Sequence, residues 1–488
     1  MLDIAGKRVT VMGLGRFGGG VGVTRWLAEQ GAEVLVTDLD PAEKLTDSIA
    51  QVQDLVDRGA VRLRLGGHNV SDFTTCDVVV ANPAVARPWE NRFLRASHAA
   101  RIPVTTEIRL LVERLPTRRH TIGVTGSAGK STTTAMIAHI LRRTAGAGRV
   151  HIGGNIGGSL LGELDRIRDG DWVVLELSSA MLYWLGRGVG YDGARGWSPS
   201  VAVITNIAPN HIDWHGTFEH YTHSKQEIFR YQDAGDAVIE AVGPSAGSAH
   251  PHAWSAGAPS VAVHARLGEL LPRVFPSALR LRVPGEHNRR NAVLAAVVAA
   301  CQRAERLPGE LPEDAVRAVL PLLEDFAGLP HRLQFVGDRM GVRCYNDSKC
   351  TTPDAAMLAV AAFADEPGAA RVHLIVGGYD KGSDLSGVAR LAAGEHALGG
   401  LYTIGKTGPT IAAAARDAAG AGSGGSARVF ECETLDRAVQ EALARAKAGD
   451  VLLLSPACAS WDQFTNFEER GERFAQVVRE SDRSGVHV

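Results

Sequence analysis

The sequence predicts an α/β protein built from several mainly parallel sheets. Short apolar runs alternate with helix-like segments, and many of these runs end in glycine-rich or polar loops. A chain of 488 residues is too long for one hydrophobic core. At about 150 residues per domain it should form about three domains. We therefore expect ligands to bind beyond the carboxyl ends of the strands, as they do in open α/β sheets.

Composition excludes several classes of function. The chain is 45% hydrophobic and 22% charged, with a formal net charge of −2 and no long basic run. That balance argues against non-specific nucleic-acid binding, which needs a basic face. We expect neither a signal peptide nor a membrane-spanning segment, since no apolar run reaches about 18 residues. The six cysteines lack paired metal spacing and predict free thiols in a reducing cytoplasm.

The first segment alternates strand and helix. The predicted strands are Arg8–Met12, Val34–Thr37 and Val78–Ala81, with a helix over Val21–Gln30. The first strand enters Gly13-Leu-Gly15, and the second ends at Asp38. This pattern resembles a dinucleotide-binding fingerprint and leaves an NAD-dependent dehydrogenase open as an alternative. A lone fingerprint is weak, however, and would leave the rest of the chain unexplained.

A second segment opens with a strand at Thr121–Thr125, a tight turn and a helix over Ser131–Leu141. The turn consists of Gly126, Ser127, Ala128, Gly129, Lys130, Ser131 and Thr132. Backbone N–H groups at a helix N-terminus form an anion site. Lys130 would neutralise a phosphate there, and Ser131 would ligate Mg²⁺. Position 124 is valine where the common phosphate-loop pattern has glycine, so this loop is shorter.

Two more strands of this segment end in polar loops. Glu176 closes the strand Val173–Leu177 and is a natural Mg²⁺ ligand, although the serines after it would equally suit a helix N-cap. The strand Val201–Asn206 leads to His211 and then to Lys225. A zinc site among the four histidines His211, His215, His220 and His223 is conceivable, but no Cys or HExxH spacing supports it.

Polar clusters continue to the end of the chain. Asn288 and Asn291 lie three residues apart in an Ala/Val-rich helix, so they share a face that suits either a purine or helix capping. Further strands are predicted at Val372–Gly377 and Val451–Ser455, each ending in a Gly- or Pro-containing loop. Gly420–Ser426 reads as a surface turn. The stretch 234–282 carries no pattern that assigns its structure.

The order of these motifs resembles the Mur ligase family. The matched strings run collinearly from about residue 120 to 475: T-G-S-A-G-K-S-T, E-L-S-S, T-N-I-x-x-N-H-I-D, Y-x-x-x-K, G-E-H-N-x-x-N, L-P-H-R, N-D-S-K and G-G-Y-D-K-G. The closing string S-P-A-C-A-S-W-D-Q-F-x-N-F-x-x-R-G is similar to the branch that adds D-glutamate, the MurD type. The first segment is matched more loosely.

The resemblance implies three domains and one reaction. The domains would be a Rossmann-like UDP-sugar domain at 1–112, a central P-loop ATPase-type α/β domain at 113–327, and a Rossmann-like amino-acid domain at 328–488. The reaction would join D-glutamate to UDP-N-acetylmuramoyl-L-alanine through an acyl phosphate and a tetrahedral intermediate, forming ADP and phosphate. It would serve peptidoglycan synthesis, and hence cell shape and division, as a cytoplasmic monomer without nucleic acid or membrane insertion.

The resemblance also assigns roles to residues. Ser131 and Glu176 would hold one Mg²⁺ ion, and His211 and Lys225 a second, with Lys225 carrying a carbamate; Lys130, His211 and Lys225 would serve catalysis. ATP would contact the tight turn together with Asn288, Asn291, Arg332 and Asp347. The D-glutamate site would consist of Lys349, Thr351, Lys381, Ser460, Trp461 and Phe467. The UDP-sugar substrate would contact Arg16, Asn155 and Ser178.

Three departures from the family pattern bear on these roles. Ala128 stands where D-glutamate-adding enzymes usually carry Asn, the first loop is more glycine-rich, and Trp461 is bulkier than usual. A folylpolyglutamate-synthase-like ligase is a second alternative, because it shares the short phosphate loop; the closing string speaks against it. A non-catalytic relative would be expected to lack residues such as Lys130 or Glu176, and both are present.

Overall fold

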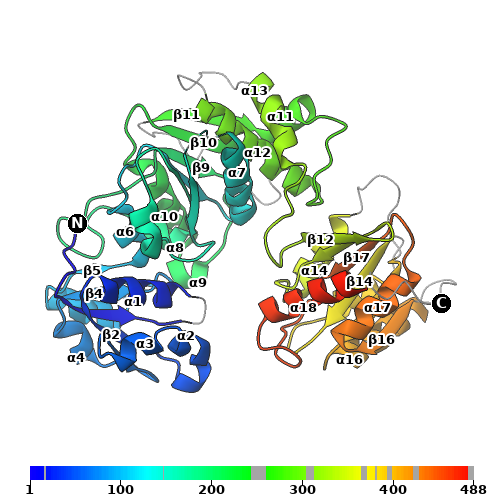
Figure 1. The fold of residues 1–488 in the computed structure, drawn as a ribbon, viewed down its shortest axis with the longest axis horizontal. Helices are drawn as coiled ribbons and strands as arrows, with labels where there is room; N and C mark the ends of the chain where they lie inside the picture. Colours follow the sequence, from blue (N-terminus) through cyan, green and yellow to red (C-terminus); the bar gives the residue numbers. More distant parts are fainter. Residues whose placement is uncertain are drawn as a thin grey trace. The chain divides into compact units, whose positions relative to one another are not determined.

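The chain forms two compact units in the computed structural model. The first comprises Met1–Pro276 with Asn291–Leu322, and the second comprises Ser277–Arg290 with Leu323–Val488. The structure describes residues 1–15, 18–144, 146, 148–242, 260–303, 313–363, 371–379, 382–392, 398–420 and 428–481. The first unit contains two sheets and the second contains one (Figure 1). The predicted α/β class is confirmed, whereas the three predicted domain ranges stay a prediction.

The first sheet is parallel throughout, with strand order β3-β2-β1-β4-β5. Its strands are β1 Arg8–Met12, β2 Glu33–Thr37, β3 Val61–Arg64, β4 Val78–Ala81 and β5 Val104–Thr105. Its helices are α1 Gly19–Glu29, α2 Thr46–Ala50, α3 Gln53–Asp57, α4 Val70–Thr74, α5 Arg92–Ala99 and α6 Glu107–Val112, with a 3-10 turn η1 at Ala42–Lys44. The strand order reverses at β1 and β4, so the loops after these strands flank the position where ligands bind in such sheets.

The Asp38 side chain accepts hydrogen bonds from backbone N–H groups in the loops of the first sheet. Its Oδ2 accepts from Gly15 N at 3.0 Å, and its Oδ1 accepts from Asp40 N at 2.9 Å. In a dinucleotide-binding site the equivalent carboxylate must hold a ribose. Each oxygen of Asp38 accepts one backbone hydrogen bond that shapes these loops and keeps a second lone pair.

The central sheet is also parallel, with order β11-β10-β9-β6-β8-β7. Its strands are β6 Thr121–Thr125, β7 Val150–Gly154, β8 Trp172–Glu176, β9 Val201–Ile204, β10 Ala237–Val242 and β11 Val261–Arg266. The helical segments of this part of the chain are α7 Lys130–Thr144, η2 Leu161–Arg166, α8 Ser179–Trp184, α9 Ile212–His215, α10 Phe218–Arg230, α11 Leu267–Val274, α12 Glu286–Arg303, α13 Glu313–Val319 and η3 Leu320–Leu323. Because β6 lies between β8 and β9, the loops after these three strands meet at one edge.

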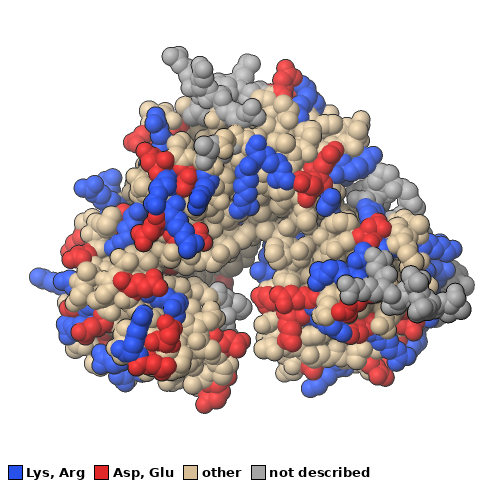
Figure 2. All heavy atoms as spheres, in the orientation of Figure 1, with Lys and Arg blue, Asp and Glu red and all other residues tan. Residues whose placement is uncertain are grey.

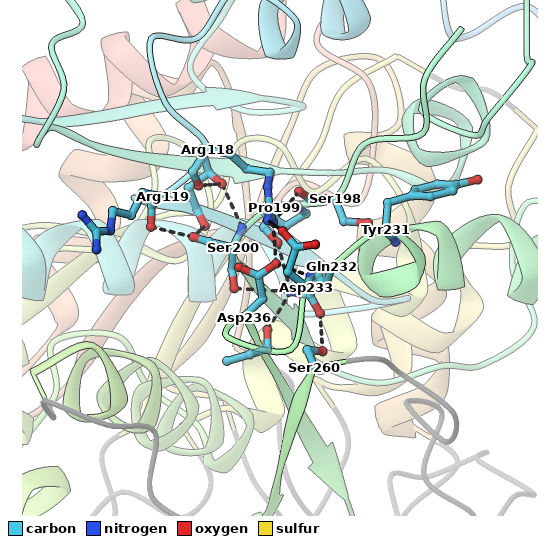
Figure 3. Close-up of polar contacts among 12 residues, drawn as sticks. Arg118, Arg119, Ser198, Pro199, Ser200, Tyr231, Gln232, Asp233, Asp236 and Ser260 are labelled. Carbon is cyan, nitrogen blue, oxygen red and sulfur yellow. Dashed lines mark hydrogen bonds and ion pairs between the residues drawn. The ribbon is translucent and has the colours of Figure 1, made fainter. Parts of the chain in front are cut away.

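A polar cluster closes the opposite, amino-terminal edge of the central sheet (Figure 3). The buried amide of Gln232 donates to Pro199 O at 2.9 Å and to Ala237 O at 2.8 Å. Arg118 pairs with Asp236 at 2.6 Å. These contacts tie the segment before β6 to the starts of β9 and β10. The loops that carry the predicted site therefore lie at the carboxyl edge, away from this cluster.

The third sheet forms the second unit, in the order β12-β13-β17-β14-β15-β16. Its strands are β12 Gln334–Arg339, β13 Val342–Asn346, β14 Val372–Gly377, β15 Gly400–Ile404, β16 Val429–Glu433 and β17 Val451–Leu454. Only β12 pairs antiparallel among these described strands. One face packs against α14 Pro353–Ala361, α15 Ser386–Arg390 and α16 Gly408–Gly420, and the other against α17 Leu435–Arg445 and α18 Phe467–Glu480. Most of the predicted turn at Gly420–Ser426 lies outside the described residues.

The charge distribution on the surface and the state of the cysteines agree with the expectations from composition. On the face shown in Figure 2, basic and acidic side chains are interspersed rather than segregated. All six cysteines are buried and none is in a disulfide. Among the described residues, no helix is both long and apolar enough to cross a membrane.

Candidate active site

The tight turn between β6 and α7 is packed so closely that only glycine fits at two positions. Gly126 has φ +147°, and a Cβ there would lie 1.9 Å from Thr205 Oγ1. Gly129 has φ +79°, and a Cβ would lie 2.7 Å from Asn291 Oδ1. Glycine adopts such φ values at little cost and leaves room for the neighbouring groups. The turn is thus moulded against the end of β9 and against α12.

The loop after β9 sets the conformation of this turn. The Asn206 side chain pairs with the Ala128 peptide: its Oδ1 accepts from Ala128 N at 3.0 Å, and its Nδ2 donates to Ala128 O at 2.9 Å. Thr205 Oγ1 donates to the same carbonyl at 2.6 Å. The Lys130 ammonium, at the first residue of α7, donates to Ser127 O at 3.2 Å. Backbone N–H groups at a helix N-terminus favour anions, and the phosphate role of this turn stays a prediction.

Glu176 presents one carboxylate oxygen without a hydrogen-bond partner. It ends β8 and is only 1% exposed. Its Oε1 accepts from Asn155 Nδ2 at 3.0 Å, whereas its Oε2 is buried and lacks a partner among the described residues. A buried carboxylate oxygen is costly to leave unsatisfied. The site therefore suits a cation, and Asn155 supports Glu176 from the end of β7.

Lys225 is a buried lysine on α10 whose neutral form is favoured. Its Nζ donates to Thr125 Oγ1 at 3.1 Å and to Gly126 O at 2.9 Å. Burial lowers its pKa well below the ordinary value, the charge of Lys130 lowers it further, and Glu176 opposes the shift. A neutral amine at this position has the lone pair that a protonated lysine lacks.

His211 completes this set of side chains. It precedes α9 in a left-handed conformation, with φ 51°. Loss of solvent lowers its pKa, Lys130 and Lys225 lower it too, and Asp213 opposes them. These mutual interactions bring together four predicted residues from four elements, here named the carboxyl-edge cluster: Lys130, Glu176, His211 and Lys225.

The chemistry of the carboxyl-edge cluster fits magnesium better than zinc. Among the described residues, no group of three His, Cys, Asp or Glu side chains is placed to hold a metal ion by itself. Zinc sites need three or four such ligands. Magnesium is held by one or two carboxylates together with waters and substrate phosphates. Glu176 ends β8, paired with Val124 of the strand that enters the tight turn, and its carboxylate is of the type that magnesium prefers.

The two asparagines predicted to face a purine have other contacts in the structure. Asn291 Oδ1 accepts from Thr133 Oγ1 at 3.4 Å, beside Gly129 of the tight turn. Asn288 Nδ2 donates to Pro284 O at 2.7 Å and anchors the segment before α12. Their role toward adenine stays a prediction. Ser178 is the N-cap of α8, with its Oγ accepting from Met181 N at 3.2 Å, which is the capping alternative.

In the second unit, Asp347 is a buried carboxyl at the end of β13. Its Oδ1 accepts from Leu333 N at 3.1 Å, and its Oδ2 accepts from Ser455 Oγ at 2.8 Å. Burial raises its pKa to about 6, against the opposing effects of these hydrogen bonds and of Arg332. The charge of Arg332 thus acts on Asp347, while the role of both residues toward ATP stays a prediction.

The residues predicted for the amino acid lie around the loops after β13 and β17. Lys349 Nζ lies 5.4 Å from the centre of the Phe467 ring. Ser460 is buried at 2% exposure, whereas Trp461 is 57% exposed, with its ring 5.6 Å from that of Tyr379. Thr351 follows the same loop as Lys349 and is half-buried. Lys381, like Arg16 of the first loop, lies outside the described residues.

Arg470 holds these two loops together. The guanidinium is 1% exposed and donates to Ser348 O at 2.8 Å, to Ser348 Oγ at 3.0 Å and to Cys458 O at 3.1 Å. Burial lowers its pKa to about 10. A buried arginine of this kind fixes backbone that has no partner in the sheet. The candidate amino-acid loops are therefore held rigidly with respect to each other.

Comparison with known proteins identifies the family. Residues 124–299 match the Mur ligase middle domain, and residues 331–458 match the Mur ligase glutamate ligase domain. A UDP-N-acetylmuramoylalanine–D-glutamate ligase of Acidobacterium capsulatum is 36% identical over 98% of this chain and 97% of its own. The enzyme of that name from Roseiflexus sp. (strain RS-1) is 36% identical over 98% and 99%.

The chain belongs to the Mur ligase family. A crystal structure of MurF from Acinetobacter baumannii shares its fold, with a TM-score of 0.53 and 18% identity over 96% of this chain and 93% of that chain. The matched ranges of the Mur ligase domains contain the whole carboxyl-edge cluster and Asp347. The full-length relatives extend the likeness to the first sheet and the last helix.

Sequence reasoning missed the residues that support this Mur ligase site. Asn206 shapes the tight turn and Arg470 joins two loops, yet in the sequence each is one letter of a matched string without a predicted role. Each follows or faces a strand end, which is a signal that singles out many polar residues. Their roles need the strand order, which places β9 beside β6 and β17 beside β13.

Proposed function

We propose that this Mur ligase joins D-glutamate to UDP-N-acetylmuramoyl-L-alanine at the expense of ATP. ATP transfers its terminal phosphoryl group to the alanine carboxylate and leaves as ADP. The D-glutamate amine then attacks the acyl carbon, and the tetrahedral intermediate expels phosphate. The convergence of the carboxyl-edge cluster at the tight turn between β6 and α7 carries the proposal. Full-length relatives that bear the name of this ligase favour it over a folylpolyglutamate-synthase-like activity.

The tight turn and Lys130 supply the charge that phosphoryl transfer requires. A carboxylate is a poor electrophile, and phosphorylation gives it a leaving group. Charge spreads over the phosphoryl oxygens in the transition state, so fixed cations and backbone N–H groups accelerate the step. Lys130 starts α7 directly beside the N–H groups of the turn. Its ammonium would meet the terminal phosphates of bound ATP.

Magnesium would be held by side chains of the same edge. Ser131 and Glu176 would contribute to one ion, and His211 and Lys225 to a second. When bound, the ions would neutralise phosphate oxygens and polarise the acceptor carboxylate. The unpartnered Oε2 of Glu176 is the observation that supports the first position.

Lys225 would ligate magnesium only after modification. A protonated lysine has no lone pair, and a neutral amine is a poor Mg²⁺ ligand, since that ion prefers oxygen. Addition of CO₂ to the neutral amine, with loss of one proton, gives a carbamate with two oxygens. The burial of Lys225 and its depressed pKa supply the neutral amine that this step needs.

The second unit would bind the incoming amino acid and part of ATP. Asp347 and Arg332 would contact the nucleotide, while Lys349 and Ser460 would contact the carboxylates of D-glutamate. Lys349 is exposed on its loop and lies over the Phe467 ring, where a cation is stabilised by the π face. An attacking amine must be held near the acyl carbon, so rigid loops favour the reaction.

One assay tests the proposal. ADP release from ATP is measured with UDP-N-acetylmuramoyl-L-alanine and magnesium across a panel of amino acids that includes D-glutamate, L-glutamate, L-lysine and D-alanine. We expect release with D-glutamate at least about tenfold faster than with any other, because recognising two carboxylates in one handedness discriminates strongly. Preference for another amino acid, or for a folate acceptor, would refute it.

A further inference from the structure

The buried imidazole of His215 is hydrogen-bonded at both ring nitrogens. Its Nε2 lies 2.9 Å from Ser179 Oγ, and its Nδ1 lies 2.9 Å from His220 Nδ1. The His215 residue is 2% exposed. The chain Ser179–His215–His220, here named the histidine relay, therefore has no ring nitrogen of His215 left for a metal or a substrate.

The histidine relay joins the three segments that carry the magnesium-ligand candidates. Ser179 begins α8, three residues after Glu176. His215 ends α9, four residues after His211, and His220 lies on α10, five residues before Lys225. Each end of the relay is thus within about two helical turns of a candidate ligand.

A neutral His215 satisfies both hydrogen bonds of the relay. A short N–N contact needs one protonated and one bare nitrogen. Either His220 donates to His215, which then donates to Ser179, or the direction is reversed throughout. If both Nδ1 atoms carried a proton, the two N–H groups would point at each other and repel. Burial and the neighbouring cations fit this reading, since they lower the pKa of His215 to about 3.

Aromatic rings pack against the relay and connect it to the first sheet. The Trp214 ring lies 4.4 Å from His215, and the Trp89 ring lies 4.5 Å from His220. Trp214 Nε1 donates to Pro83 O at 3.0 Å, in the loop after β4. His215 and Ser179 are both buried, and a hydrogen bond between buried groups is stronger than one in water.

We propose that His215 is a positioning residue that fixes the mutual placement of Glu176, His211 and Lys225. Magnesium accepts little deviation from octahedral geometry, so ligands from three separate segments need a common brace. Groups that orient metal ligands without touching the ion typically change metal affinity by about 10–100-fold when removed. The inference rests on the proposed function only in requiring a metal-dependent nucleotide site.

The test uses variants of His220, which leave His215 and the candidate ligands in place. His220→Phe keeps a ring against Trp89 and removes the N–N bond. His220→Asn places an amide near the position of Nδ1 and can still donate to His215. His223→Phe is the matched control, because His223 lies on the same helix with its side chain 59% exposed.

The readout is metal binding by the full chain. Free Mn²⁺ is followed by electron paramagnetic resonance in the presence of a non-hydrolysable ATP analogue, and melting temperature is recorded without metal. We expect His220→Phe to raise the half-saturating Mn²⁺ concentration about tenfold or more, His220→Asn by less than about threefold, and His223→Phe not at all. A His220→Phe variant that melts earlier but binds Mn²⁺ normally would reduce the relay to a stabilising contact and overturn the inference.

The outcomes separate this inference from the proposed function. A wild-type chain that binds Mn²⁺ with the nucleotide but does not use D-glutamate would refute only the amino-acid assignment. A wild-type chain without metal-dependent nucleotide binding would overturn both. Equal loss of affinity in His220→Phe and His220→Asn would show that the hydrogen bond is not the cause, and would also overturn the positioning role.

Discussion

Two buried ionisable side chains show how single residues are adapted in this molecule. Burial lowers the pKa of Lys225 well below its ordinary value and raises the pKa of Asp347 to about 6, so in both cases it favours the neutral form. Burying a charge costs more than burying a neutral group, so such residues persist where a ligand or a modification compensates them. Asp347 directly follows β13, and Lys225 donates to Gly126 O of the tight turn, where the proposed ligands would supply this compensation.

Replacing Lys225 should abolish turnover in a way that small carboxylates reverse. Lys225→Ala removes the group that would carry the carbamate, and we expect a loss of about 100-fold or more in ADP release, as for loss of a central electrostatic group. Added formate or acetate should restore part of the rate by filling the vacated space with oxygen. The exposed Lys44→Ala variant serves as the control and should keep full activity. Unchanged turnover in Lys225→Ala would eliminate the carbamate.

Asp347 should make the wild-type chain lose stability as pH rises. Its folded pKa of about 6 exceeds the ordinary value of 3.8, so its contribution is fully present below about pH 4 and is lost as pH rises through 6. The wild type should therefore lose stability relative to Asp347→Asn between about pH 4.5 and 7.5, by about 3 kcal/mol at most. The free energy of unfolding of the wild type and of Asp347→Asn is measured in urea at about pH 4.5 and about pH 7.5.

The exposed Glu324→Gln variant is the matched control for that comparison. Its stability difference from the wild type should not change over the same pH range. A difference between wild type and Asp347→Asn that is constant with pH would show that the Asp347 carboxyl titrates normally in the folded chain.

At the scale of elements, strands were easier to predict than the contacts between their ends. The bounds of β1, β4, β6 and β14 agree with the prediction. Strands of a parallel sheet are buried on both faces, so they form continuous apolar runs whose ends are marked by glycine or polar residues. The strands β10 and β11 were not predicted, since the stretch around them is dominated by small and polar residues. Glu176 was predicted because it ends an evident strand. Asn206 was not assigned its role, because strand order is a property of long-range packing.

The loop after β7 offers a direct test of packing at a strand end. Gly154 and Gly158 both have positive φ, at 87° and 85°, but differ in the space around them. A Cβ at Gly154 would lie 2.2 Å from the Glu176 carbonyl oxygen, whereas one at Gly158 meets nothing within 4 Å. Gly158→Ala should cost about 1 kcal/mol of backbone strain. Gly154→Ala should cost at least about 3 kcal/mol, because two backbones must separate.

The Gly154→Ala and Gly158→Ala variants should also differ in activity. Gly154→Ala should also weaken nucleotide-dependent turnover, since it displaces Asn155 from Glu176, while Gly158→Ala should retain most of it. Unfolding free energies in urea and ADP release are measured for both variants. Equal destabilisation by the two substitutions would contradict the close approach of β7 and β8 at this edge.

At the scale of the whole molecule, the two units have separate hydrophobic cores. One cluster of buried residues runs through the first two sheets, and other clusters cover the two faces of the third. Domains with their own cores tend to unfold as separate cooperative units. The described residues thus predict two transitions rather than one when the chain is unfolded at equilibrium.

The reactivity of the buried thiols shows how many unfolding transitions occur. Cys76 and Cys301 belong to the first unit, and the second unit holds Cys344, Cys350, Cys432 and Cys458. Burial raises the pKa of Cys344 to about 12 and that of Cys350 to about 11, so native thiols should react slowly with a disulfide reagent. With increasing urea, reactive thiols should appear in groups of two and four. A single step releasing all six thiols would show instead that the two units unfold together.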